Sequence, residues 1–208
     1  MENPPPKRSR REQYALTTKQ AIVDAARRLF SQRGYFATTV DDIAAAADVA
    51  PATVYSSTGG KQGLISEMVR LWQSDPLIET TLDGVRASSD PYEVIAKLSA
   101  AARQIRERWS DVIVILLTTA PHDSGIAEQL EPASQYYRRC IEEIAQRIVD
   151  LGGLRERLEV ADAADILWFY FGYSGLNTLH YENGWTYDRA EHWLAEQASR
   201  ELLGARPM

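Results

Sequence analysis

The stretch TTVDDIAAAADVAPATVYSSTGGKQGLI, residues 38–65, contains two short helix patterns separated by a tight polar turn. Thr39 can cap the first helix, and two acidic residues follow in its first turn, where the helix dipole favours negative charge. After a break at residues 48–50, Pro51 occupies the first position of a second helix, where proline is favoured, and Gly59 ends it. The inward stripe of the first helix consists of Val40, Ile43, Ala44 and Ala47.

Further helices are expected on both sides of this stretch. Upstream, Thr17 or Thr18 can cap a helix that ends at Gly34, and its apolar residues recur at helical spacing. Downstream, a helix starts near Lys61 and ends before Pro76. Three short helices followed by a longer one, with a tight turn between the second and third, predict a helix-turn-helix module.

The third helix of this module has two distinct sides. Val54 belongs with the core, which leaves small and hydroxyl-bearing side chains on the other side. Such a face can approach the major groove closely, donate hydrogen bonds to phosphates and touch base edges. The outward residues are Ala52, Thr53, Tyr55 and Ser56.

The run from Thr58 to Lys61 superficially resembles the end of a nucleotide-binding phosphate loop. That motif requires glycine at the position of Tyr55 and serine or threonine at the position of Gln62, and it follows a strand. These requirements fail, so a nucleotide site is excluded. The glycine amides, the helix start and Lys61 instead suit a phosphate of duplex DNA.

Charge is distributed unevenly along the chain. Residues 1–73 carry a net charge of +3 and residues 74–208 a net charge of -9, so the amino-terminal part is the one expected to meet a polyanion. Residues 1–14 are rich in proline and arginine and predict a disordered arm beside the DNA. Its basic cluster consists of Lys7, Arg8, Arg10 and Arg11.

Cysteine content and hydropathy predict a cytoplasmic protein. Cys140 is the single cysteine, which excludes an internal disulfide and is consistent with a reducing compartment. The amino terminus lacks the apolar stretch of a secretory signal. The longest apolar runs are well short of the ~20 residues needed to cross a bilayer, so no membrane contact is expected.

Downstream of Pro91 the pattern remains helical, so the prediction is an all-α protein with an amino-terminal helix-turn-helix domain and a larger helical ligand-binding and dimerisation domain. Closing helices are expected at about 161–181 and 187–203. The expected divisions are an arm at 1–14, a three-helix DNA-binding domain at 15–60, a linking helix at 61–75 and a helical effector-binding and dimerisation domain at 76–208.

The stretch from Thr18 to Trp72 resembles the DNA-binding domain of the TetR family of bacterial transcriptional regulators. The resemblance rests on AIVDAARRLFSQRGYFATTVDDIAAAADVAPATVYSSTGGKQGLI, residues 21–65. It implies phosphate contacts for Thr39 and Tyr55, a backbone contact for Lys61, and a groove-facing role for Ala52, Thr53 and Ser56. Two residues depart from the pattern: Thr58 replaces a usual aromatic residue, and Gly60 replaces a frequent serine.

The end of the chain resembles the last two helices of many TetR-type proteins, which form a four-helix bundle with a symmetry mate. Apolar residues surround the first of these helices almost completely, so it needs cover on both sides. A homodimer binding a near-palindromic operator is therefore expected, and a central helix of a monomer is the alternative. The interface candidates are Tyr170, Gly172, Tyr173, Leu176, Leu179, Trp185, Trp193 and Leu194.

The segment between the two matched regions is expected to bind a small apolar or aromatic effector whose binding releases the DNA. Its candidate pocket residues are Trp109, His122, Tyr136, Tyr137 and Trp168, although ordinary core or interface packing is the more common role for each of them taken alone. A regulator without an effector is one alternative.

An enzyme is the other alternative. It would use His122 and Asp123 with Glu128 or Glu131, but no pair of histidines has a metal-ligand spacing and no nucleophile motif is present. Neither catalysis, nor a cofactor, nor a metal is therefore expected.

Overall fold

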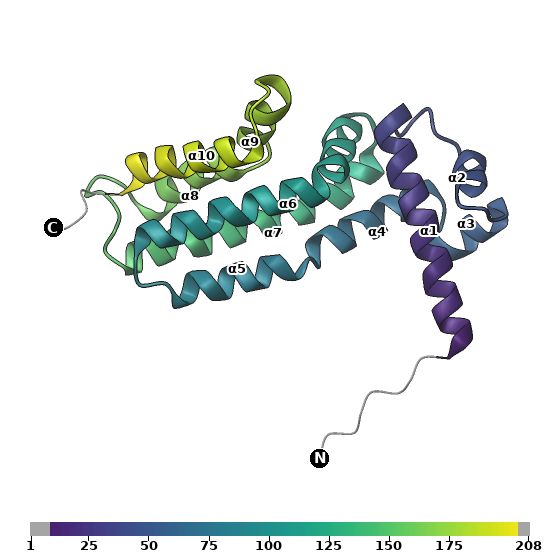
Figure 1. The fold of residues 1–208 in the computed structure, drawn as a ribbon, viewed down its shortest axis with the longest axis horizontal. Helices are drawn as coiled ribbons and strands as arrows, with labels where there is room; N and C mark the ends of the chain where they lie inside the picture. The colour runs from purple at the N-terminus through teal and green to yellow at the C-terminus, as the bar shows by residue number, and fades with distance from the viewer. Residues whose placement is uncertain (1–8, 204–208) are drawn as a thin grey trace, which may run out of the picture. The chain divides into compact units, whose positions relative to one another are not determined.

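The computed structural model describes residues 9–203, and every regular element in that range is helical (Figure 1). Leu154 and Leu203 form an isolated bridge, the one strand-like pairing among these residues. The prediction of an all-α protein is confirmed. The helices form two compact units: the first comprises the chain up to Trp72 together with Asp111–Leu130, and the second comprises Gln73–Ser110 and the chain from Glu131 onward.

The first unit contains the predicted helix-turn-helix. The helices of this module are α1 (Arg10–Arg33), α2 (Val40–Ala46), α3 (Pro51–Thr58) and α4 (Lys61–Gln73). Helices α2 and α3 lie beside each other and against α1 (Figure 1). Fully buried apolar residues from all four helices form the core: Ile22, Ala26, Phe30, Ile43, Val54, Leu64, Ile65 and Met68. The spacing of apolar residues therefore identified the inward faces correctly.

The start of α1 differs from the prediction. The helix begins at Arg10, not after Thr17 or Thr18, because Ser9 accepts a hydrogen bond from the Glu12 amide while the Glu12 carboxylate accepts one from the Ser9 amide. This capping box is a strong start signal that needs no apolar residue nearby. Residues 10–14 of the expected disordered arm are thus helical, and Lys7 and Arg8 lie outside the described residues.

The second unit has a core built mainly from five helices, with Leu176 and Leu179 added from the turns after residue 171. The five helices are α5 (Pro76–Ala87), the first part of α6 (Pro91–Thr119), the later part of α7 (Ser124–Asp150), α8 (Val160–Phe171) and α10 (Tyr187–Leu202). Helices α8 and α10 pack side by side (Figure 1). The apolar run VIVILL, residues 112–117, lies within α6, which is one continuous helix.

The helix expected at 161–181 is interrupted. It stops at Phe171, and the chain resumes as a short turn, α9 (Gly175–Asn177), and a π-helical turn, Thr178–Glu182. At the interruption, the Tyr137 hydroxyl donates to the Phe171 carbonyl at 2.6 Å, and the Arg106 Nη2 donates to the Gly172 carbonyl at 2.7 Å. Side chains from α7 and α6 thereby satisfy backbone carbonyls at the end of α8.

Candidate functional site

The amino-terminal end of α2 is fixed by Thr39. Its hydroxyl and its amide both donate to Asp42 Oδ2, at 2.6 and 2.9 Å, and the Asp42 amide donates back to the hydroxyl at 3.1 Å. The hydrogen bonds from Thr39 lower the pKa of Asp42, which keeps this carboxylate charged. Thr39 caps α2 and is also exposed to solvent. Its exposure is compatible with the phosphate contact that the resemblance implies.

The outward face of α3 is open, as predicted from its sequence. Val54 is completely buried, whereas Ala52 and Ser56 are exposed and 58% of Tyr55 is accessible. Thr53 is half-buried on the same short helix. An exposed two-turn helix with small side chains and one long hydroxyl-bearing ring is suited to entering the major groove of DNA.

Gly60 makes room for the Tyr55 ring. The glycine has φ of +84°, and a Cβ added to it would lie 3.1 Å from the Tyr55 Cε1 atom. The ring thus rests over the turn between α3 and α4, which supports Tyr55 while its hydroxyl stays accessible. Thr58, which replaces the usual aromatic residue of the family, donates from its hydroxyl to the Val54 carbonyl at 2.8 Å.

Gly63 determines how closely α4 approaches α3, and the sequence analysis missed it. A Cβ at this position would lie 1.5 Å from the Thr58 carbonyl oxygen and 2.7 Å from its carbonyl carbon. The first turn of α4 therefore packs directly on the backbone that ends α3. The only sequence signal for this close approach is a glycine inside a helix. Glycine destabilises a helix, so its presence there indicates that another segment packs closely against it.

Lys61 contacts the protein at the corner between α1 and α2. Its Nζ donates to the Tyr35 carbonyl at 2.6 Å and lies 4.2 Å from the centre of the Tyr35 ring. Partial burial lowers the pKa of Lys61, against the opposing influence of Asp123. An ammonium has three donors, so the bond to Tyr35 leaves two for a phosphate. The DNA contact of Lys61 stays a prediction.

Next to α3, a depression of about 610 Å³ lies between residues of α1, α3 and α4. Two cations border it, and both pair with Glu67: Lys19 Nζ at 2.8 Å and Arg70 Nη2 at 2.6 Å. The hydrogen bond from Arg70 is the main reason why the pKa of Glu67 falls to about 2. Arg10 and Arg11, in contrast, are exposed in the first turn of α1, where the basic cluster continues as helix.

In the second unit, the structure brings together two of the five candidate effector residues. The Tyr137 and Trp168 ring centres lie 5.3 Å apart, and Tyr173 joins them at 6.0 and 5.4 Å. Tyr173 thus belongs to this aromatic cluster, although its sequence position had suggested a dimer contact. The buried guanidinium of Arg106 lies 5.6 Å from the centre of the Tyr173 ring.

The other three effector candidates lie elsewhere. The Trp109 indole donates to Asp75 Oδ2 at 2.8 Å, and the Tyr136 hydroxyl donates to Glu79 at 3.3 Å. His122 is exposed in the first unit, in the 3-10 turn that follows α6. The five candidates are therefore divided between the two units and contact different neighbours, and the effector pocket stays a prediction.

The predicted dimer-interface residues divide by burial. Four are buried in their own chain and are thus unavailable to a partner: Gly172, Leu176, Leu179 and Leu194. Tyr170 is half-buried and Trp193 is 39% exposed. The sequence-based list of interface candidates omitted Phe169, which is 73% exposed on α8 beside a shallow groove of about 370 Å³.

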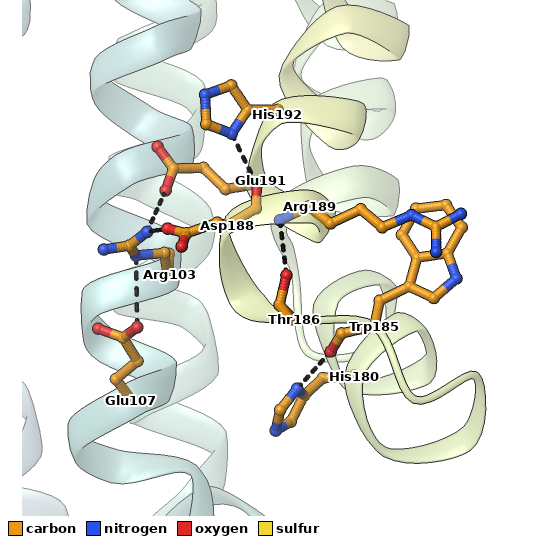
Figure 2. Close-up of polar contacts among 9 residues, drawn as sticks. All are labelled: Arg103, Glu107, His180, Trp185, Thr186, Asp188, Arg189, Glu191 and His192. Carbon is orange, nitrogen blue, oxygen red and sulfur yellow. Dashed lines mark hydrogen bonds and ion pairs between the residues drawn. The ribbon is translucent and has the colours of Figure 1, made fainter.

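Polar contacts hold the start of α10 and the turn before it (Figure 2). Arg103 of α6 pairs with Asp188 and lies 3.3 Å from Glu191. Trp185, another interface candidate, lies under the Arg189 guanidinium at 3.8 Å and meets the Trp193 ring edge-on at 5.8 Å. Trp185 is thus half-buried by its own chain, which leaves Trp193 as the more accessible of the two tryptophans.

Among the described residues, no group of three potential metal ligands gathers at one place. Within the same range, no helix is both long and apolar enough to span a bilayer. The exposed α3 on a helix-turn-helix core defines a DNA-binding protein of the helix-turn-helix class.

Comparison with known proteins specifies this class. Residues 22–68 match the model of the tetR family of bacterial regulatory proteins. The HTH-type transcriptional regulator YdeS of Bacillus subtilis is 27% identical over 154 residues, which cover 73% of this chain and 74% of that protein. Residues 22–68 are thus a DNA-binding domain of the TetR family, and the protein is a transcriptional regulator with a DNA-binding helix-turn-helix.

Solved structures share the fold across nearly the whole chain. A transcriptional regulator from Saccharomonospora viridis in complex with choline has a TM-score of 0.74 and 18% identity, covering 91% of this chain and 99% of that chain. The fatty acid degradation regulator FadR from Bacillus halodurans has a TM-score of 0.73 and 15% identity, covering 98% of this chain and 100% of that chain.

Proposed function

We propose that the protein is a homodimeric repressor that acts in the cytoplasm, binds a near-palindromic operator through α3 and releases it when a small aromatic effector binds the second unit. The exposed face of α3 carries the proposal, because Tyr55 is 58% exposed while its neighbour Val54 is completely buried. Thr39, Ala52, Thr53 and Ser56 complete the surface offered to DNA.

The dimer is supported by Phe169. An aromatic side chain that is 73% exposed on a largely apolar helix is costly in water and suits an interface between copies of the chain. Two copies related by a two-fold axis present two recognition helices to two half-sites, which is why a near-palindromic operator is expected.

The effector is supported by the aromatic cluster of Tyr137, Trp168 and Tyr173. The Saccharomonospora viridis regulator of the same fold binds choline, so a small ligand is compatible with this architecture. Helix α6 carries Arg108 and Trp109, both of which hydrogen-bond to Asp75.

Asp75 caps α5 two residues after the end of α4. A shift of α6 on effector binding would thus move Asp75, which lies two residues after the end of α4. This gives the effector a route by which it can favour a dimer that no longer fits its operator.

Light scattering coupled to gel filtration tests the proposal, with the full chain alone and with DNA selected for binding. We expect a dimer at micromolar concentration and one dimer for each selected duplex. A monomer under both conditions would contradict the proposed mode of binding.

A further inference from the structure

Arg106 is a buried cation without an acidic partner. Its side chain lies on α6 and is 2% exposed, and it forms no ion pair with an Asp or Glu among residues 9–203. In the same unit, Arg86, Arg103 and Arg108 all pair with carboxylates. Within the described part of the chain, the guanidinium of Arg106 has one hydrogen-bond acceptor, the Gly172 carbonyl at 2.7 Å from Nη2.

A lone buried guanidinium is unfavourable. Arginine remains protonated in proteins, and its fork has five N–H donors. Burial lowers the pKa of Arg106, and no nearby carboxylate offsets this, since the charges that raise it belong to tyrosine hydroxyls. A charge in this position is normally paired or hydrogen-bonded to an anion.

The unused donors of Arg106 are not completely enclosed by the protein. Neither Nε nor Nη1 of Arg106 has a protein acceptor, yet neither is a fully enclosed unsatisfied atom; among the described residues only Arg147 Nε is. A space that admits at least a water molecule therefore adjoins the guanidinium. Its donors are thus available to a group that the protein itself does not provide.

The walls next to this charge are aromatic. Tyr173 lies 5.6 Å from the guanidinium carbon, and Tyr137 and Trp168 contact the Tyr173 ring. The Tyr137 hydroxyl is already used by the Phe171 carbonyl, and the Tyr173 hydroxyl lies 3.1 Å from Ser134 Oγ. The Arg138 guanidinium lies 4.2 Å from the centre of the Trp168 ring, so this cluster combines ring surface with the charges of Arg106 and Arg138.

The backbone here is also irregular. Helix α8 stops next to the cluster, and a Cβ on Gly172 would lie 2.3 Å from the Trp168 carbonyl oxygen. A π-helical turn, Thr178–Glu182, follows, and such turns inside helical segments are frequent at functional sites. The charge, the rings and the irregular backbone all meet at the end of α8.

We propose that the effector is an aromatic carboxylic acid whose carboxylate binds Arg106 and whose ring lies against Tyr137, Trp168 and Tyr173. The inference deepens the proposed function, since it rests on effector binding in the second unit. A carboxylate matches one guanidinium in charge and accepts two parallel hydrogen bonds from its fork. A cation such as choline would be repelled by the same group.

Isothermal titration calorimetry with the full chain tests this, using acids and their primary amides as pairs of equal shape. The probes are 2-naphthoate with 2-naphthamide, and indole-3-acetate with indole-3-acetamide. We expect at least one acid to bind about tenfold or more tightly than its amide, because a charge-assisted pair is lost in the amide. This comparison uses the wild-type chain and needs no variant to fold.

The variants Arg106→Gln and Arg106→Lys locate the effect. The preference for acid over amide should vanish in Arg106→Gln and persist, weakened, in Arg106→Lys, which keeps the charge but loses the fork. Arg147→Gln is the matched control, since Arg147 also donates to a carbonyl, that of Ser88, but lies outside the cluster. It should keep the wild-type preference.

The inference is overturned if no acid of the set binds, if amides bind as tightly as acids, or if Arg106→Gln keeps the preference. DNA binding, followed in parallel by fluorescence anisotropy, separates this from the proposed function. Acids that bind through Arg106 without releasing DNA would refute effector control and leave the acid site standing. Release of DNA by the neutral amides alone would support effector control and refute the acid site at Arg106.

Discussion

For the replacement of Gly63 by alanine, helix propensity predicts a gain in stability, whereas packing predicts a loss. In an isolated helix, alanine is about 1 kcal/mol more favourable than glycine, so α4 by itself would be stabilised. In the folded protein the new Cβ would lie 1.5 Å from the Thr58 carbonyl oxygen, whereas real Cβ contacts stay beyond 3.0 Å. The end of α3 must therefore move by at least about 1.5 Å relative to α4.

The cost of this movement follows from the closeness of the contact. Overpacking costs ~1–3 kcal/mol, and a clash with backbone, which cannot rotate away, belongs at the upper end of that range. After the gain in propensity, Gly63→Ala should lower the free energy of unfolding by about 2 kcal/mol. For a chain of this length that corresponds to a fall in Tm of about 4–8 °C.

Gly84 on α5 provides the matched control. A Cβ there would meet only the flexible end of Lys97, at 3.2 Å from Cε, so Gly84→Ala should stabilise the protein by up to ~1 kcal/mol. Thermal and urea unfolding measure both variants, and anisotropy measures their DNA affinity, which should fall only for Gly63→Ala because α3 is displaced. A Gly63→Ala protein at least as stable as the wild type would refute the packing argument.

Three further predictions concern single side chains. Lys61→Ala should weaken binding to every DNA sequence and reduce the slope of log affinity against log salt by about 1, while Lys61→Arg keeps the slope; an unchanged slope in the alanine variant would exclude a phosphate contact. Phe169→Glu should leave the fold of each chain intact, because this side chain is exposed in the single chain, but raise the dimer dissociation constant about tenfold or more in sedimentation; an unchanged constant would remove Phe169 from the interface. Glu67→Gln should destabilise the protein at neutral pH. Since folding lowers the pKa of Glu67 from 4.5 to about 2, the loss in free energy of unfolding is complete above the unfolded pKa and shrinks as the pH falls from 4.5 to about 2. A loss of stability that is independent of pH would contradict the ion pairs of Glu67 with Lys19 and Arg70.

Local signals predicted the DNA-binding module well. Thr39, Pro51 and Gly59 mark helix ends through caps and backbone preferences that act within a few residues, and the structure has the ends of α2 and α3 where these residues predict them. The burial of Val54 followed from spacing alone. The Ser9 and Glu12 capping box is of the same kind and was overlooked. So was Asp75 with Pro76, which begins α5.

Features that depend on packing between distant segments had no such signal. The need for glycine at position 63 arises from the backbone of Thr58, and the interruption after Phe171 is stabilised by side chains from α6 and α7. In the sequence, nothing distinguishes Arg106 from the other arginines on amphipathic helices. Its isolation from carboxylates is a property of the assembled unit, as is the exposure of Phe169.

The most direct test of the central claim is selection of DNA from a random pool by the purified full chain, followed by measurement of affinity and stoichiometry. The proposed function predicts an enriched, near-palindromic sequence bound by one dimer, with affinity lost when either half-site is scrambled. Recovery of no preferred sequence, or of an asymmetric site bound by a single chain, would contradict a dimeric regulator that recognises DNA through α3.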